Sequence, residues 1–203
     1  MTRRKAMTAH EFLGRWPEPP DPAVRARLAR EEEERRQREL EYKRAEQPLV
    51  AELRSVGWDV SSVWDLVNID EAYPEALPVL VRHLARPYPP AIRDGIARAL
   101  AVRNALFAWD NLREQYVAEQ DKLAKQGFAA ALAAMVDRDH LDELLALLRD
   151  RRHGPSRGIL LRGLQRLRDA RARAALEELA DDPDLKKQIG IILHRRHLRQ
   201  SRP

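Results

Sequence analysis

Apolar residues recur three and four positions apart through most of the chain after residue 48, with polar residues between them. This spacing predicts helices that each bury one stripe of side chains, and no segment alternates with the period of a strand. The whole pattern also repeats at an interval of about 32 residues. Five columns of large apolar residues align at that interval: Leu77, Trp109 and Leu141; Leu80, Leu112 and Leu144; Leu84, Tyr116 and Leu148; Ile96, Phe128 and Leu160; Leu100, Leu132 and Leu164.

A fixed interval of this size is typical of stacked helix pairs, because each pair can bury its apolar face only against its neighbours. The regular repeats occupy residues 74–198, and residues 47–70 form a shorter, degenerate unit that we expect to cap the stack. Ser61 is the expected N-cap of a helix in that capping unit. The predicted fold is therefore all-α, an α-solenoid of about five helix pairs in a domain at 47–203.

Residues 1–46 are predicted to be a separate N-terminal arm. Residues 1–21 end in PEPPDP, where proline favours extended backbone. Strong helix formers and Glu–Arg pairs at helical spacing then predict a charged helix from Ala23 to about Glu46, with Asp21 as its cap. We expect this helix to be solvated; the alternative is a partner-binding coiled coil, which requires sustained apolar heptads. Pro48 is expected to bend or restart the chain.

One repeat in particular carries a family resemblance. The segment LPVLVRHLARPYPPAIRDGIARAL consists of a predicted helix, a turn with proline, and a second helix that opens with arginine and continues with small and aliphatic residues. It resembles a HEAT repeat of the HEAT and armadillo superfamily, and the resemblance covers residues 74–198. The resemblance implies a curved, right-handed stack whose second helices line a concave surface, which the superfamily uses mainly to bind other macromolecules.

The composition limits the class of protein. The chain has 203 residues, of which 44% are hydrophobic and 34% charged, and it contains no cysteine. Disulfides, thiolate metal sites and cysteine nucleophiles are therefore excluded. There is no secretory signal pattern and no run of 18 apolar residues, so we expect a cytoplasmic protein with no membrane segment. Arginine and alanine are abundant in the way that a GC-rich bacterial or phage genome produces.

Candidate chemistry is sparse. His194 and His197 lie one helical turn apart, but neighbouring arginines would repel a metal ion, and a basic helix end explains the same residues. The acidic segment that begins at Asp137 fits a helix start better than a catalytic carboxylate cluster. No nucleophile elbow, phosphate-binding glycine loop or zinc-protease motif occurs. We therefore predict no catalytic residue, no cofactor and no metal. Trp16, in EFLGRW, is a candidate docking motif or an anchor for the arm.

Basic residues are the strongest functional signal, with a net charge of +5. They are concentrated from residue 149 to 173, and Arg162, Arg166 and Arg173 are expected to share an exposed stripe. Arg98 lies two repeats before Arg162, but Ala130 interrupts the positive column, which weighs against a long nucleic-acid track. The predicted partner-binding residues are Arg98, Arg162, Arg166 and Arg173.

Two further groups of residues are expected to be structural. Arg93, Lys125 and Arg157 open successive second helices, where a basic residue pairs with acidic groups of the neighbouring turns. Glycine inside a helix lowers stability by about 1 kcal/mol relative to alanine, so helical glycines are expected where stacked helices approach closely. These glycines are Gly95, Gly158, Gly163 and Gly190.

The sequence thus predicts a non-enzymatic HEAT-like scaffold that binds another protein, with an acidic surface on the partner. Two alternatives remain open. One is a nucleic-acid binder that uses the same arginines, and the other is a small HEAT-fold enzyme that acts on nucleic acid. The oligomeric state is not predicted by any feature of the chain.

Overall fold

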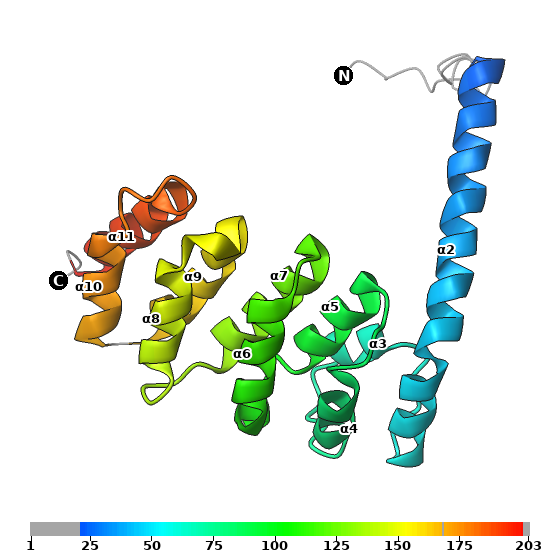
Figure 1. Cartoon of the computed structure of the whole chain (residues 1–203), viewed down its shortest axis with the longest axis horizontal. Helices are drawn as coiled ribbons and strands as arrows, with labels where there is room; N and C mark the ends of the chain where they lie inside the picture. Colours follow the sequence, from blue (N-terminus) through cyan, green and yellow to red (C-terminus); the bar gives the residue numbers. More distant parts are fainter. Residues whose placement is uncertain (1–20, 168, 201–203) are drawn as a thin grey trace, which may run out of the picture. The chain divides into compact units, whose positions relative to one another are not determined.

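A computed structural model of the protein describes residues 21–167 and 169–200, without the side chains of 196–200 (Figure 1). Within these residues every regular element is a helix, as the sequence predicts. The chain divides into two compact units, Met1–Glu41 and Tyr42–Pro203. Most of the predicted N-terminal arm, including Trp16, lies outside the described residues.

The described part of the first unit is the start of helix α2 (Pro22–Ser55), which is the predicted charged helix. The carboxylate of Asp21 accepts a hydrogen bond from the amide of Ala23 at 2.7 Å, as expected of a cap. Every side chain from 21 to 41 is exposed. Ion pairs along the helix, such as Arg27 with Glu31 at 3.5 Å, have the predicted helical spacing.

The prediction that a new helix starts at Pro48 is wrong. Helix α2 continues through Pro48 to Ser55, across the boundary predicted at residue 46. Proline removes one backbone hydrogen bond from a helix, but the turn that follows is held by packing, because Leu49 and Leu53 are fully buried.

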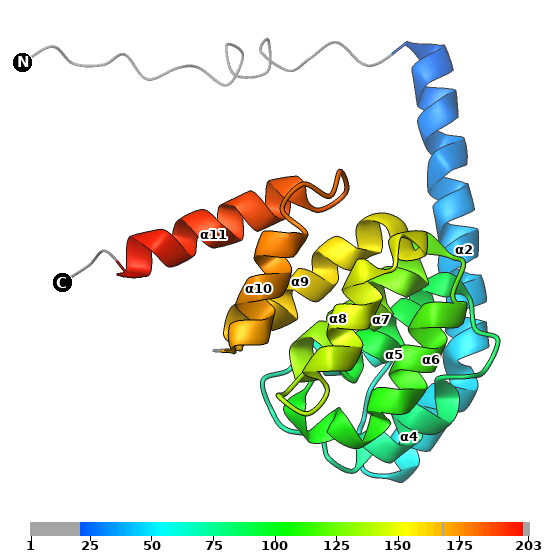
Figure 2. The same cartoon turned by 60° about the vertical axis from the view of Figure 1, so that its left-hand side comes forward.

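The second unit continues with a series of short helices. They are α3 (Val63–Val67), α4 (Ala76–His83), α5 (Pro90–Ala99), η1 (Arg103–Ala108), α6 (Trp109–Ala118), α7 (Lys122–Met135), α8 (Leu141–Arg149), η2 (Arg151–Ser156), α9 (Arg157–Arg166), α10 (Ala170–Glu178) and α11 (Lys186–Gln200). Helices α3, α5, α7, α9 and α11 form a row in which each contacts the next, while α4, α6 and α8 pack on α5, α7 and α9 respectively. Figure 2 shows α5, α7, α9 and α11 from a second direction.

One continuous core runs through this unit. All fifteen residues of the five repeating columns are buried, from Leu77 in α4 to Leu164 in α9. The repeat therefore identifies the core correctly. Trp109 is 2% exposed, whereas Trp58 and Trp64 are only partly buried against the core.

Local details at α3 differ from the prediction. Ser62, not Ser61, is the N-cap, and its hydroxyl accepts a hydrogen bond from the amide of Trp64. A second amide of the first turn, that of Val63, donates a hydrogen bond of 2.6 Å to the buried carboxylate of Glu46. Glu46, in α2, therefore accepts a hydrogen bond from an amide in the first turn of α3 that has no partner within the helix. The two residues are 17 positions apart in the sequence.

Glycines mark two of the closest approaches between helices. A Cβ atom added to Gly127 would lie 2.8 Å from the Cα atom of Asp94, so α5 and α7 pack backbone against backbone. At Gly163 it would lie 2.7 Å from Val136, as predicted for a stacked helix. The same prediction is wrong for Gly190, where an added Cβ atom would meet nothing within 4 Å.

Candidate functional site

The internal basic column accounts for one group of cations. The side chain of Arg157 is fully buried at the start of α9. Its guanidinium donates two hydrogen bonds of 3.0 Å to the carboxylate of Asp182 and one of 2.9 Å to Asp184. A further hydrogen bond of 3.0 Å reaches the carbonyl of Leu148. The hydrogen bond from Arg157 holds the pKa of Asp182 below its ordinary value of 3.8.

The other two members of this column also point into the fold, but only Arg93 pairs with a carboxylate. Arg93 forms an ion pair with the buried carboxylate of Glu119 at the end of α6. Lys125 donates a hydrogen bond of 2.9 Å to the carbonyl of Glu119, and its ammonium lies 5.1 Å from the centre of the Tyr116 ring. Burial lowers the pKa of Lys125. The predicted pairing with acidic groups is confirmed for Arg93 and Arg157, whereas Lys125 contacts a backbone carbonyl and an aromatic ring instead. All three cations have partners within the fold, so none is a candidate for binding a partner protein.

Most of the exposed basic tract is also neutralised within the fold. Arg149 pairs with Glu178, Arg152 with Asp150, Arg171 with Asp142 and Asp169, Arg151 with Asp182, and Arg173 with Glu177. These pairs lie at the surface, where each contributes little to stability. Each nevertheless places a carboxylate beside an arginine, which weakens the positive field that a phosphate backbone would require.

Arg173 does not share a stripe with Arg162 and Arg166, so that part of the prediction is wrong. Helix α9 ends at Arg166, and the backbone of Leu167 is extended, with φ −82° and ψ 123°. A new helix, α10, starts after Asp169, whose carboxylate caps it. Because the helical phase is lost at this break, spacing along the sequence does not relate residues on the two sides of it.

A groove of about 480 Å³ lies over α7, α9 and α11, and we call it the arginine groove. The small side chains of α7 line one part of it, and the longer polar side chains of α9 and α11 line the rest. Its lining residues are Ala130, Ala133, Ala134, Arg162, Gln165, Arg166 and Arg195. No carboxylate is among them, so the local field is positive.

The three arginines of the groove are not equivalent. Arg166 donates hydrogen bonds to the carbonyls of Ala133 and Ala134, the last turn of α7. Burial lowers the pKa of Arg166, and the nearby charge of Arg103 lowers it further. Arg162 and Arg195 are exposed, and neither has an ion-pair or hydrogen-bond partner in the part of the chain that the structure describes. These two guanidiniums are therefore available to a ligand, whereas Arg166 caps a helix end.

A smaller hollow of about 240 Å³ adjoins the arginine groove between α9 and α11, and we call it the aliphatic pocket. It shares two wall residues, Arg162 and Gln165, with the groove. Its other lining residues are Pro155, Gly158, Ile159, Leu161, Gln188, Ile191 and Ile192. Branched aliphatic side chains therefore continue the surface on the far side of Arg162.

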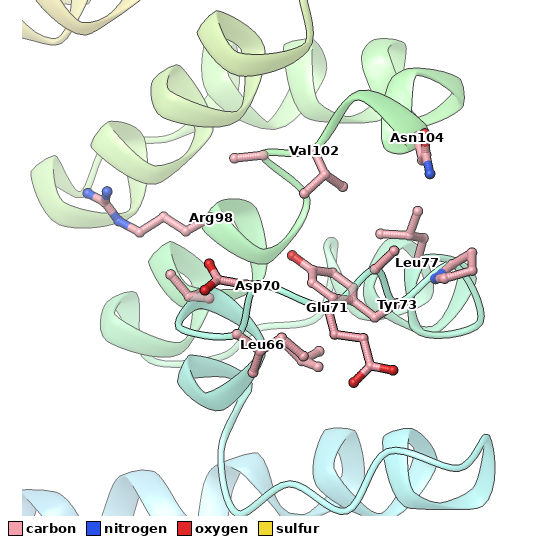
Figure 3. A pocket seen from close by; sticks show the side chains of 13 residues that line it. Leu66, Asp70, Glu71, Tyr73, Leu77, Arg98, Val102 and Asn104 are labelled. Carbon is pink, nitrogen blue, oxygen red and sulfur yellow. The ribbon is translucent and has the colours of Figure 1, made fainter.

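Arg98 lies in a different hollow from the other predicted contacts. Its Nε donates a hydrogen bond of 2.8 Å to the buried carboxylate of Asp94. Together with residues of α3, α4 and the following segments, it lines a cleft of about 520 Å³. Figure 3 shows Arg98 at one end of this cleft and Asn104 at the other. In the cleft wall, the hydroxyl of Tyr73 donates to the carbonyl of Ala99 at 2.8 Å, so this polar group is already satisfied.

The structure thus brings Arg162 and Arg166 together, separates both from Arg98 and Arg173, and adds Arg195. The sequence contains a signal for Arg195, because it follows Arg162 by one repeat and one residue. Arg195 also belongs to the segment HRRH, and a cluster of basic residues near a helix C-terminus has a structural explanation of its own. Only the packing of α11 on α9 shows that Arg195 faces the same groove.

The described residues contain neither a metal-ligand cluster nor a membrane-spanning helix. In residues 21–167 and 169–200, no group of three or more histidine or acidic side chains is placed to hold a metal ion. The side chain of His197 lies outside the described part. No helix in the described ranges combines the length and apolar character that crossing a bilayer requires.

Comparison of the chain with models of protein families, with curated proteins and with solved structures finds no match. The geometry of the second unit and the chemistry of its surface are therefore the basis for assigning a function.

Proposed function

We propose that this protein is a non-enzymatic HEAT-like scaffold, a right-handed α-solenoid of about five helix pairs that binds an acidic segment of a partner protein. Its second helices α5, α7, α9 and α11 present the binding surface. The repeating buried columns and the row of contacting helices support the solenoid architecture. The internal basic column supports the HEAT-like interpretation, because Arg93 and Arg157, at equivalent points of two units, each pair with a carboxylate about 25 residues later in the chain.

The arginine groove carries the proposal. Arg162 and Arg195 come from neighbouring helices, line one groove, and have no acidic partner in the described chain. Alanines of α7 leave room beside them for another chain to approach. Unpaired arginines in a concave surface attract carboxylates, and the guanidinium fork can hold a carboxylate through two hydrogen bonds. The expected partner surface is therefore acidic.

Two observations favour a local acidic contact over a nucleic-acid track. The first is the internal pairing of the basic tract, which leaves few uncompensated charges over α10 and its neighbours. The second is the alanine floor at Ala130, where a track along successive second helices would need a basic residue. A duplex has regularly spaced phosphates, so a surface that tracks one needs basic residues at successive positions.

The test is the double substitution Arg162→Glu with Arg195→Glu, which changes the groove by four charge units. Both side chains are exposed and unpaired, so the melting temperature should change little. A partner isolated with the wild-type protein from its source organism and then purified should lose at least about tenfold in affinity. The matched control is Arg44→Glu with Lys122→Glu, an equal charge change at exposed positions outside the groove.

Binding of the purified partner and of generic duplex DNA should be measured side by side at two salt concentrations. The proposal expects loss of the partner in the groove variant, full binding in the control variant, and weak duplex binding in all proteins. Strong duplex binding with a steep salt dependence, reduced by the groove variant, would instead identify a nucleic-acid binder. Equal loss in both variants would show that net charge, and not this groove, determines binding.

A further inference from the structure

The aliphatic pocket and the arginine groove open next to each other on the same surface. Arg162 and Gln165 belong to the walls of both hollows, so these two side chains of α9 separate the aliphatic residues of the pocket from the rest of the arginine groove. A ligand that reaches Arg162 therefore lies beside both environments. This arrangement suits a ligand that carries an acidic group and an apolar group close together.

The aliphatic pocket is large enough for a side chain. Its volume is about 240 Å³, whereas an apolar cavity of about 150 Å³ can accept benzene. Ile191 forms part of its wall and remains 47% exposed, one of the few large apolar side chains of the described chain that the core does not cover. Burial of this surface by a partner side chain is favourable.

Gly158 helps to keep the pocket open. It lies inside α9, where glycine is unfavourable compared with alanine. An added Cβ atom there would meet only the side chain of Gln188, at 3.1 Å, and no backbone. This contact is tight, but the end of the Gln188 side chain can move, so glycine is not required here by an approach of two backbones. The missing side chain instead leaves space in a hollow that Gly158 itself lines.

We infer that the ligand of this surface is a short acidic peptide segment with an aromatic or branched aliphatic anchor within a few residues of its carboxylates. The anchor occupies the aliphatic pocket, and the carboxylates bind Arg162 and Arg195. The inference rests on the proposed function and makes it more specific. Charge complementarity selects the carboxylates, and the adjoining apolar walls select the anchor.

The first experiment selects ligands from a display library of random short peptides with the full-length protein. The enriched sequences should combine acidic residues with an aromatic or branched aliphatic residue. The same selection on the Arg162→Glu, Arg195→Glu variant should not enrich them. Enrichment of sequences without an acidic group, or without an apolar anchor, would overturn the inference.

The second experiment measures one enriched peptide by fluorescence anisotropy, together with two altered peptides. One has the anchor replaced by serine, and the other has its acidic residues replaced by their amides. Each alteration should weaken binding at least about tenfold, since burial of one large apolar side chain and one ion pair with arginine each contribute about that much.

Protein variants then test whether the apolar anchor of the peptide binds in the aliphatic pocket. Ile191→Ser removes apolar wall at an exposed position, and Gly158→Leu fills the pocket. Both should weaken the unaltered peptide to the level of the serine peptide, and neither should change binding of the serine peptide itself. Because Gly158→Leu can also disturb α9, the exposed Ile191→Ser variant keeps the test valid if the first variant does not fold.

The outcomes separate the inference from the function on which it rests. If acidic peptides bind through Arg162 and Arg195 but the anchor and Ile191→Ser have no effect, the inference is wrong and the acidic-partner function stands. If the protein binds duplex DNA and no acidic peptide, both are wrong.

Discussion

Removal of the buried guanidinium of Arg157 is the perturbation for which the structure gives the clearest magnitude. Arg157→Met keeps an unbranched apolar chain of similar length but removes all the hydrogen bonds to Asp182, Asp184 and the carbonyl of Leu148. The side chain of Asp182 is only 3% exposed, so its carboxylate would remain buried without its main counter-charge. Breaking a buried pair in this way lowers the free energy of unfolding by about 3 to 5 kcal/mol.

Urea denaturation followed by circular dichroism gives the free energy of unfolding for the wild type and the variant. A second variant, Arg157→Met with Asp182→Asn, tests the physical cause. Asparagine keeps a hydrogen-bond acceptor for the amide of Asp184, which now bonds to Asp182 at 3.0 Å, and removes the stranded charge. The double variant should therefore be more stable than Arg157→Met alone by at least about 1 kcal/mol.

The pair also predicts a pH dependence. The pKa of Asp182 in the folded protein lies below its ordinary value of 3.8, chiefly because of the hydrogen bond from Arg157. A lowered pKa stabilises the fold fully above that ordinary value, and this stabilisation is lost as the pH falls through the folded pKa. Without Arg157, burial favours the protonated form of Asp182, so the difference in unfolding free energy between the wild type and Arg157→Met should shrink as the pH falls through this acidic range.

Two results would refute this reasoning. If Arg157→Met lowered the free energy of unfolding by less than about 1 kcal/mol, the pair would behave as an exposed ion pair. If the double variant were no more stable than the single one, the penalty would not arise from the buried charge.

The remaining predictions concern packing and the N-terminal boundary. Gly127→Ala should destabilise the fold strongly in thermal melts, because its Cβ atom would lie 2.8 Å from the backbone of α5. The matched change Gly190→Ala should be neutral or stabilising by up to about 1 kcal/mol. Equal effects of the two changes would refute the packing argument. Leu144→Ala, at a fully buried position, should cost about 2 to 5 kcal/mol by urea denaturation, and a neutral result would contradict its place in the core. A shortened chain that starts at Tyr42 should keep the melting temperature of the second unit. A chain that starts at Gln47 should melt at a lower temperature, because it lacks the Glu46 carboxylate that accepts a hydrogen bond from the start of α3. Identical melting temperatures would show that this contact is dispensable.

The repeating columns show how far pattern alone can predict this protein. Each large apolar residue in the columns is buried, because a helix that shows one apolar stripe has no other way to remove it from water. The internal role of the basic column was also predictable, but the counter-group was the expected carboxylate only for the two arginines, because Lys125 bonds to a backbone carbonyl. Arg157 and Arg93 both find a carboxylate about one helix later.

Local propensity was less reliable at element boundaries. Pro48 is a helix breaker in isolation, yet α2 passes through it because buried Leu49 and Leu53 hold the next turn. Gly190 and Gly127 look alike in sequence, but only Gly127 lies against another backbone. The difference depends on which face of each helix meets its neighbour, and this is a property of packing.

The all-helical class, the core columns and the internal basic column were determined by the sequence itself, because they follow from periodicity within and between repeats. The composition of the candidate site was decided by tertiary structure. Arg162 and Arg195 converge only because α11 packs on α9, and Arg173 is lost from the site because α9 ends at Arg166. Helical spacing relates residues on one helix, whereas a groove joins several helices, so its lining depends on how those helices pack.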